Sequence, residues 1–273
     1  MRASVHVGEG TSRKSIATEA LLAGLRRIGI SHELRSLNDA PARTSDFALV
    51  WGHKHRVCTI ARSCGFPLLV VERPFFGDRA KNYSLTWNWA HRLGIRPPPG
   101  DSHRPQPTLD PWTKRDSGSI VVFDQVPTDI MFQDVAGSEW AERVARDAER
   151  FWNRDAFVRP HPQVRQTCSL EQDLQSAWMG ISYTSTAAVG CVAAGVPCVA
   201  VNPKSMAYDV CSAYPQYRLT PDREEWAHWL SWCQWNGSEL EDGTALTHVL
   251  KAYDAAKEKT HTNFKRSDAD GNS

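Results

Sequence analysis

Short runs of apolar, often β-branched residues alternate with longer stretches in which apolar residues recur every three or four positions. The short runs predict buried strands, and the longer stretches predict amphipathic helices. Early in the chain, strands are expected at Ser4–Val7, Phe47–Trp51 and Leu68–Val71. A helix ending at Gly29 is expected after the first strand. This alternation is typical of a parallel sheet covered by helices, so the fold class is expected to be α/β.

The buried face of that first helix is expected to consist of Ile16, Ala20, Leu21, Leu25 and Ile28. Each of these apolar side chains lies three or four positions, or a multiple of a turn, from another in the set.

A proline-rich segment interrupts the alternation, because residues 96–112 contain six prolines and little that would build a core. Such a composition is typical of a semi-rigid connection. Beyond it the alternation resumes, with strands expected at Ser119–Phe123, Ala156–Val158, Met179–Ser182 and Pro197–Val201 and helices expected at Glu139–Trp152, Ala187–Ala194 and Glu224–Gln234. Ser169 and Gln172 have the spacing of a capping box at a further helix start.

Two Rossmann-like lobes that face each other across a cleft are therefore predicted. We place the first in residues 1–107 and the second in residues 108–220, with closing helices in 221–256 and a flexible tail in 257–273. A chain of 273 residues suits two lean lobes of roughly 100–150 residues each.

Composition excludes several classes of protein. Hydrophobic residues make up 41% of the chain and charged residues 23%, which excludes wholesale disorder. The formal net charge is +1, so no global field attracts nucleic acid or an anionic membrane. No segment resembles an export signal and no apolar run approaches eighteen residues, so we expect a cytoplasmic protein without a membrane span.

The seven cysteines are expected to be free and mostly buried thiols. They are odd in number, and no two of them form a C-x-x-C pair, which disfavours a metal site.

Ligands of open α/β sheets bind beyond the carboxyl ends of the strands, so the residues that follow each predicted strand are the first candidates. In the second lobe, Arg159 and His161 follow one strand, and His161 lies between two prolines that limit how the loop relaxes. The alternative is a rigid surface turn. With the loop described next, the pair suggests an anion site.

Three hydroxyl-bearing residues open the apolar helix that follows the next strand. Thr184, Ser185 and Thr186 come after Tyr183, and backbone N–H groups at a helix start bind anions. Ordinary capping by Ser185 or Thr186 explains part of this pattern. At the entrance of the same lobe, Gln125, Thr128 and Asp129 form a polar loop suited to a sugar or a base, or alternatively a solvated turn.

In the first lobe, Glu72 and Asp78 bring two carboxylates to a strand end beside Arg73 and Arg79. One of the acids is a candidate general base. The alternative is a structural ion pair between Glu72 and an arginine, since an unpaired buried Glu72 would be costly.

Two further clusters lie near strand ends of the first lobe. His53 and Lys54 follow the strand that ends at Trp51, and with Gly10, Arg73 and Arg79 they are our candidates for acceptor binding. Gly8-Glu9-Gly10 lacks the third glycine of a dinucleotide fingerprint, so NAD is not predicted. Trp87 and Trp89 form either an aromatic platform for a ligand or, as is commoner, part of the core.

Three motifs in the second lobe resemble the donor-binding half of GT-B glycosyltransferases, and most of all the capsule-polysaccharide Kdo transferase group. They are Asp124-Gln125-Val126-Pro127-Thr128-Asp129, Arg159-Pro160-His161-Pro162 and Tyr183-Thr184-Ser185-Thr186, within a similarity that spans Ser119–Val201. Asp124 stands where that group has glycine, and Val192 and Ala193 stand where it has an acidic residue. A different nucleotide-sugar is therefore plausible.

The first lobe resembles small phage-encoded glycosyltransferases, some of which modify hydroxymethylated pyrimidines in DNA. The resemblances together imply a GT-B enzyme that moves a sugar from a nucleotide-sugar to an acceptor hydroxyl. A UDP-sugar is the expected co-substrate, with no further cofactor and no metal. DNA is one possible acceptor, in the cytoplasm of a host cell if the protein is phage-encoded.

In this scheme Gln125, Thr128, Arg159, His161 and residues 183–186 bind the donor, and Glu72 or Asp78 is the base. Other functions stay open, namely transfer to a surface or capsule glycan, a nucleotide-sugar epimerase-like activity, and ligand binding without catalysis. An epimerase would return an altered free donor without any acceptor, and a binding protein would release no nucleotide.

Overall fold

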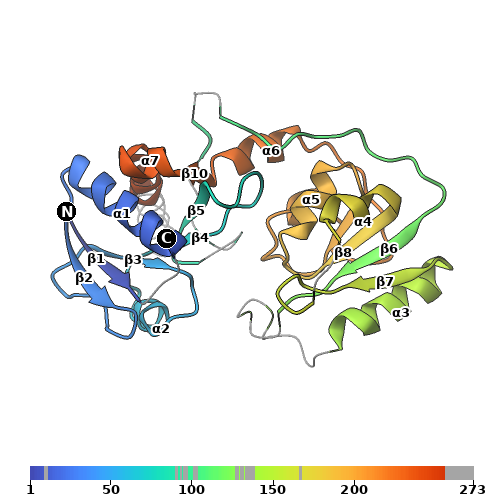
Figure 1. Ribbon diagram of the computed structural model, residues 1–273, viewed down its shortest axis with the longest axis horizontal. Helices are drawn as coiled ribbons and strands as arrows, with labels where there is room; N and C mark the ends of the chain where they lie inside the picture. Colours follow the sequence, from blue (N-terminus) through green and yellow to red (C-terminus); the bar gives the residue numbers. More distant parts are fainter. Residues whose placement is uncertain are drawn as a thin grey trace, which may run out of the picture. The chain divides into compact units, whose positions relative to one another are not determined.

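A computed structural model describes residues 1–8, 12–89, 92, 94, 98–100, 104–126, 129, 132, 139–165 and 168–255. Within it the chain is mixed α/β and divides into two compact units (Figure 1). Unit 1 comprises residues 1–103 and 232–273, and unit 2 comprises residues 104–231.

Unit 1 is built on a six-stranded mixed sheet with the order β10-β5-β4-β3-β1-β2. Four neighbouring strands run parallel, and β5 and β10 run antiparallel to their neighbours. The strands are β1 (Arg2–Val7), β2 (Ser31–Ser36), β3 (Phe47–Trp51), β4 (Leu68–Glu72), β5 (Asn82–Trp87) and β10 (Gln234–Asn236). The sequence predicted β1, β3 and β4 but none of the other three.

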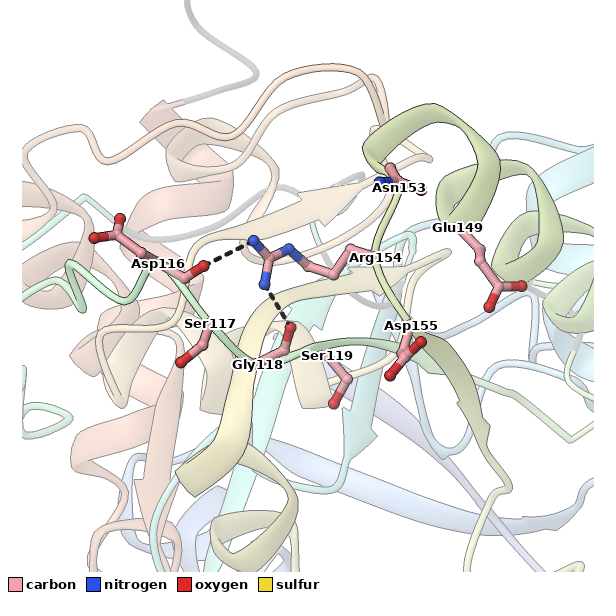
Figure 2. A pocket seen from close by; sticks show the side chains of 8 residues that line it. All are labelled: Asp116, Ser117, Gly118, Ser119, Glu149, Asn153, Arg154 and Asp155. Atoms are coloured by element: carbon pink, nitrogen blue, oxygen red, sulfur yellow. Dashed lines mark hydrogen bonds between the residues drawn. The ribbon is translucent and has the colours of Figure 1, made fainter.

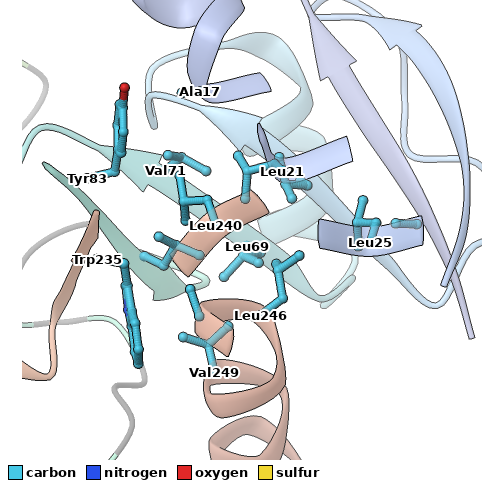
Figure 3. Close-up of a cluster of buried hydrophobic side chains, with 14 of the residues drawn as sticks. Ala17, Leu21, Leu25, Leu69, Val71, Tyr83, Trp235, Leu240, Leu246 and Val249 are labelled. Carbon is cyan, nitrogen blue, oxygen red and sulfur yellow. The ribbon is translucent and has the colours of Figure 1, made fainter. Parts of the chain in front are cut away.

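Helices cover both faces of this sheet. The helices α1 (Ser12–Arg27), α7 (Gly237–Glu241) and residues 244–255 pack on one face, and α2 (Arg56–Ser63) packs on the other. Figure 3 shows Leu21 and Leu25 of α1 in one cluster with Leu240, Leu246 and Val249 from the end of the chain. Strand residues alternate between the two faces, so Leu49 enters this cluster and its neighbour Val50 enters the one beneath α2.

The buried face of α1 corrects one expectation. Ile16 is 59% exposed, whereas Ala17, Leu21 and Leu25 are buried. Steps of four residues from Ala17 keep one face of the helix against the sheet, and Ile16 is rotated away from that face.

The last part of the chain returns to unit 1. We predicted one helix over Glu224–Gln234, but α6 (Glu224–Ser231) ends earlier and Gln234 begins β10. The predicted closing segment 221–256 is thus shared, with α6 in unit 2 and the rest in unit 1. Strand β10 pairs with β5, a contact between segments about 150 residues apart that no local pattern reveals.

Unit 2 contains a four-stranded parallel sheet with the order β7-β6-β8-β9. Its strands are β6 (Ser119–Phe123), β7 (Ala156–Arg159), β8 (Ala177–Ser182) and β9 (Cys198–Ala200), each within two residues of its prediction. The helices are α3 (Trp140–Trp152), α4 (Leu170–Ser176), α5 (Ala187–Ala193) and α6, with a 3-10 turn, η2, at Tyr208–Val210.

The capping box predicted at the start of α4 is confirmed. The Ser169 side chain accepts a hydrogen bond from the Gln172 N–H, and the Gln172 side chain accepts one from the Ser169 N–H. These reciprocal bonds satisfy two N–H groups at the helix start and fix its first turn.

All seven cysteines are free, and Cys58, Cys191, Cys198 and Cys233 are buried. Among the residues that the structure describes, no helix has the length and apolar character to cross a membrane.

Candidate functional site

The carboxyl ends of the strands form one polar edge in each unit, because parallel strands all end on the same side of a sheet. In unit 2, Asp124 and Gln125 follow β6, Arg159 ends β7, and residues 183–186 follow β8. The predicted donor residues that the structure describes therefore share one edge. Thr128 lies outside the described residues.

Gln125 and Thr184 bind each other at this edge. Their exposed fractions are 4% and 3%. The Thr184 N–H donates to Gln125 Oε1 over 2.7 Å, and Gln125 Nε2 donates to Thr184 Oγ1 over 2.9 Å. These bonds join the loop after β6 to the loop after β8, so both residues hold the shape of the edge.

Arg159 is held in an ion pair with helix α4. Its Nε lies 2.5 Å from Asp173 Oδ2, and its second guanidinium nitrogen donates to the Cys168 carbonyl over 2.8 Å. The two charged side chains are only 10% and 12% exposed. The positive charge predicted to face a phosphate is therefore balanced by Asp173, and Arg159 fixes α4 against β7.

His161 and Asp124 lie close enough to interact electrostatically. The Gln163 N–H donates to His161 Nδ1 over 3.2 Å, so in the neutral imidazole the proton is on Nε2. Burial raises the pKa of the Asp124 carboxyl, against the opposing effects of the Gln125 N–H and the His161 charge. In the sequence, Asp124 stands out only as a departure from a motif. Its position directly after a central strand was the signal that could have singled it out.

The side chains of the hydroxyl-bearing loop after β8 partly stabilise the loop itself. Ser185 Oγ accepts from the Ala187 N–H over 3.2 Å and so bonds the first N–H of α5, whereas Thr186 is the N-cap residue and makes no side-chain cap hydrogen bond. Tyr183 packs edge-on against Phe132 and Trp140, with ring centroids 5.5 and 5.6 Å away. The Tyr183 ring therefore packs against the core of unit 2, although the residue follows β8 at the polar edge.

In unit 1, His53 and Glu72 form a hydrogen-bonded pair at the ends of β3 and β4, with a buried imidazole and a half-buried carboxylate. His53 Nδ1 lies 3.0 Å from Glu72 Oε1. Glu72 therefore has a histidine as one hydrogen-bonding partner, and an ion pair between Glu72 and an arginine stays a prediction. Gly52 makes the turn out of β3 with φ of +83°, a conformation that side chains disfavour.

Asp78, the second candidate base, stabilises a turn. Its Oδ1 accepts from the Ala80 N–H over 2.7 Å, and its Oδ2 lies 3.7 Å from Lys81 Nζ. The side chain is 48% exposed. These contacts are those of a loop residue in an Asx-type turn.

The proposed acceptor residues differ in burial. Lys54, Arg73 and Arg79 are exposed, and His53 is 8% exposed. Gly10 lies outside the described residues. No sequence pattern pointed to Gln234, whose Oε1 accepts from the Phe75 N–H over 2.9 Å and so holds the loop after β4 in place. Trp87 is buried in the core and stacks on Tyr253, whereas Trp89 is 36% exposed.

A pocket of about 630 Å³ lies at the opposite edge of the unit 2 sheet, where β6 and β7 begin. Figure 2 shows Arg154 bonded to the carbonyls of Asp116 and Gly118 at its margin. The carboxylates of Asp116, Glu149 and Asp155 also line it. Because ligands of parallel sheets bind at the other edge, we do not assign this pocket to the donor.

Among the described residues, no group of three or more His, Cys, Asp or Glu side chains is arranged to hold a metal ion.

Similar folds occur among solved structures. The KpsC β-Kdo 2,7-transferase of Thermosulfurimonas dismutans matches with a TM-score of 0.50 at 12% identity, over 86% of this chain and 92% of that one. The KpsC β-Kdo 2,4-transferase of the same organism matches with a TM-score of 0.51 at 12% identity, over 85% and 91%. The chain shares its overall fold with these two structures. No family model and no curated protein matches the sequence.

Proposed function

We propose that this protein is a glycosyltransferase that moves a sugar from a nucleotide-sugar to an acceptor hydroxyl. The observation that carries the proposal is the Kdo transferase fold over more than four fifths of the chain. The polar edges of both sheets support it, because they lie where ligands bind in folds of this kind. The proposal includes the GT-B arrangement expected from the sequence.

In the proposed reaction, the acceptor oxygen attacks the anomeric carbon of the donor sugar. The bond between that carbon and the phosphate oxygen breaks, and its electron pair leaves with the nucleotide. Glu72 receives the proton of the acceptor hydroxyl. We favour Glu72 over Asp78 because Glu72 is held by His53 at a strand end, whereas Asp78 stabilises an exposed turn.

The leaving phosphate would be stabilised at the unit 2 edge. His161, when protonated or through Nε2–H, is the donor on the loop after β7, and the Ser185–Thr186 loop contributes on the other side of β6. Hydrogen-bond donors held in fixed positions around the leaving phosphate stabilise the negative charge that develops as the bond breaks. This stabilisation is usually the largest single contribution to catalysis. The proposed mechanism uses no metal ion.

A glycan is the proposed acceptor. The similar structures are transferases of Kdo, a sugar acid, and the net charge of +1 gives no support to DNA as a partner. The donor nucleotide expected from the sequence is UDP. An activated form of Kdo is the alternative that the neighbours' names suggest.

The test is a thermal-shift screen against UDP-glucose, UDP-N-acetylglucosamine, GDP-mannose and CMP-activated Kdo, followed by measurement of nucleotide release. Acceptors are an oligosaccharide ending in Kdo and DNA containing hydroxymethylcytosine. We expect one donor to raise the melting temperature and to release nucleotide only when the glycan is present. Release with the DNA alone would redirect the acceptor assignment, and an altered free sugar without any acceptor would indicate an epimerase.

In the same assay, His161→Ala should lower turnover at least about tenfold, since removing one stabilising donor costs that much or more. His228→Ala, on α6, is the matched control and should keep its activity. No stabilisation by any donor, together with no nucleotide release, would overturn the proposed function.

A further inference from the structure

The register between β3 and β4 brings His53 to Glu72. Trp51 pairs with Val71, so Gly52 lies beside Glu72 and its N–H donates to the Val71 carbonyl over 2.8 Å. A Cβ on Gly52 would lie 3.7 Å from Glu72 Oε1. The glycine thus lets the chain turn beside the carboxylate, and His53 reaches back to it from the next position.

The two partners differ in accessibility. The His53 side chain is 9% exposed, and the Glu72 side chain is 25% exposed. A substrate therefore reaches the carboxylate more readily than the imidazole. The 3.0 Å contact requires a proton on His53 Nδ1, since the carboxylate oxygen accepts. In this geometry the His53 Nδ1–H holds the Glu72 carboxylate in one orientation.

The backbone of His53 is itself held by α2. Arg62 donates from one guanidinium nitrogen to the His53 carbonyl over 3.3 Å and from Nε to the Asn88 carbonyl over 3.0 Å. Its guanidinium also stacks on the Trp89 ring, 4.0 Å from the centroid. A half-buried arginine with this many contacts has little freedom to move. Arg62 thus holds the backbone of the loop that carries His53, and Glu72 holds the His53 side chain.

We infer that His53 is a positioning residue, which orients the Glu72 carboxylate through its Nδ1–H so that Glu72 accepts the proton of the acceptor hydroxyl. The inference rests on the proposed glycosyltransferase function. It replaces the role that the sequence suggested for His53, which was direct acceptor binding. His53 acts only through Glu72, and Arg62 supports it by holding its backbone.

The experiment compares four variants with the unaltered protein, using the donor and glycan that give the highest nucleotide release in the screen above. Asparagine places an amide N–H where Nδ1 lies, whereas glutamine places its amide farther out, near the position of Nε2. We expect His53→Leu and His53→Gln to lower kcat at least about tenfold with the donor KM unchanged, because general base catalysis contributes factors of about 10² to 10⁴. His53→Asn should recover most of the loss. His32→Leu, at the opposite edge of the sheet, is the matched control and should keep its activity.

Two further readouts separate orientation from structure. The pH at which kcat falls on the acidic side of its pH profile should shift in His53→Gln and should not shift in His53→Asn. Adding His53→Gln to Glu72→Gln should lower kcat no further, because residues that act as a unit are not additive. If His53→Leu does not fold, the Asn and Gln variants decide the question.

Full turnover in His53→Gln, or equal losses in the Asn and Gln variants, would overturn the inference while leaving the glycosyltransferase proposal intact. An unaltered protein that turns over no donor would overturn both.

Discussion

At the scale of single residues, most polar side chains at the two sheet edges are bonded to one another. Gln125 binds Thr184, Arg159 binds Asp173, and His53 binds Glu72. The residue types indicated that these side chains can bind ions or transfer protons. Which role each side chain takes depends on the residue to which it is bonded. An arginine beside a carboxylate holds a helix, whereas a histidine that carries its proton on Nε2 is suited to donate to a phosphate.

His6 provides a prediction at this scale. It is 2% exposed in β1, and its Nδ1 lies 2.8 Å from the Ser36 carbonyl. Burial lowers the pKa of His6 below its ordinary value, so the folded protein keeps it neutral where the unfolded chain already takes up a proton. Its contribution to stability is therefore complete above about pH 6.5 and is lost as the pH falls below that value.

We expect the free energy of unfolding to fall more between pH 7.5 and pH 5.5 in the unaltered protein than in His6→Asn, which keeps a donor near Nδ1 but does not titrate. Urea denaturation at the two pH values measures the difference. An identical pH dependence in both proteins would contradict this account.

At the scale of elements, α1 and α7 approach each other closely at Gly24. A Cβ on Gly24 would lie 2.0 Å from the Leu240 carbonyl oxygen and 3.1 Å from Leu246 Cδ1. The carbonyl belongs to the backbone of a packed helix, so it cannot move aside cheaply. Glycine in the middle of α1 is thus explained by helix packing, although it weakens the helix taken alone.

Gly24→Ala tests this explanation. Helix propensity alone predicts a gain of about 1 kcal/mol. We expect instead a loss of about 1–3 kcal/mol in the free energy of unfolding, because overpacking displaces the backbone. Gly237→Ala in α7 is the matched control, since nothing lies within 4 Å of its added Cβ, and it should be neutral or stabilising. An increase in the free energy of unfolding of Gly24→Ala, measured by denaturant titration, would show that α1 and α7 can move apart at little cost.

At the scale of the whole molecule, unit 1 is assembled from both ends of the chain. Trp235, Leu240, Leu246 and Val249 are all 1% exposed or less and share a core with β1, β3 and β4. The Trp87 indole N–H donates to the Val249 carbonyl over 2.8 Å. The unit that carries Glu72 therefore depends on residues that follow the whole of unit 2.

Truncation after Ser231 is expected to unfold unit 1 and to leave unit 2 folded. It removes one edge strand and several fully buried side chains, each worth roughly 1.5–3 kcal/mol, from a domain whose total stability is about 5–15 kcal/mol. Limited proteolysis with mass analysis should cut within residues 1–103 and spare residues 104–231. Equal protection of both units would show that residues 1–103 fold without the C-terminal segment.

The local sequence by itself determined the α/β class, the central parallel strands, the capping box at Ser169 and the strand ends where polar residues gather. These features follow from nearest-neighbour periodicity and turn chemistry, which act over a few residues. Only the tertiary structure decided that β10 joins β5, that Gln234 holds the loop after β4 and that His53 meets Glu72. Those contacts join residues from 19 to 159 positions apart, and the backbone path that brings them together is set by packing of the whole unit. Strand β2 escaped notice for the same reason, since its side chains are mostly polar and pairing with β1 holds it in the sheet. Strands β5 and β10 carry Tyr83, Leu85, Trp87 and Trp235, which are buried in the core, but only the pairing of segments distant in the sequence placed them in the sheet.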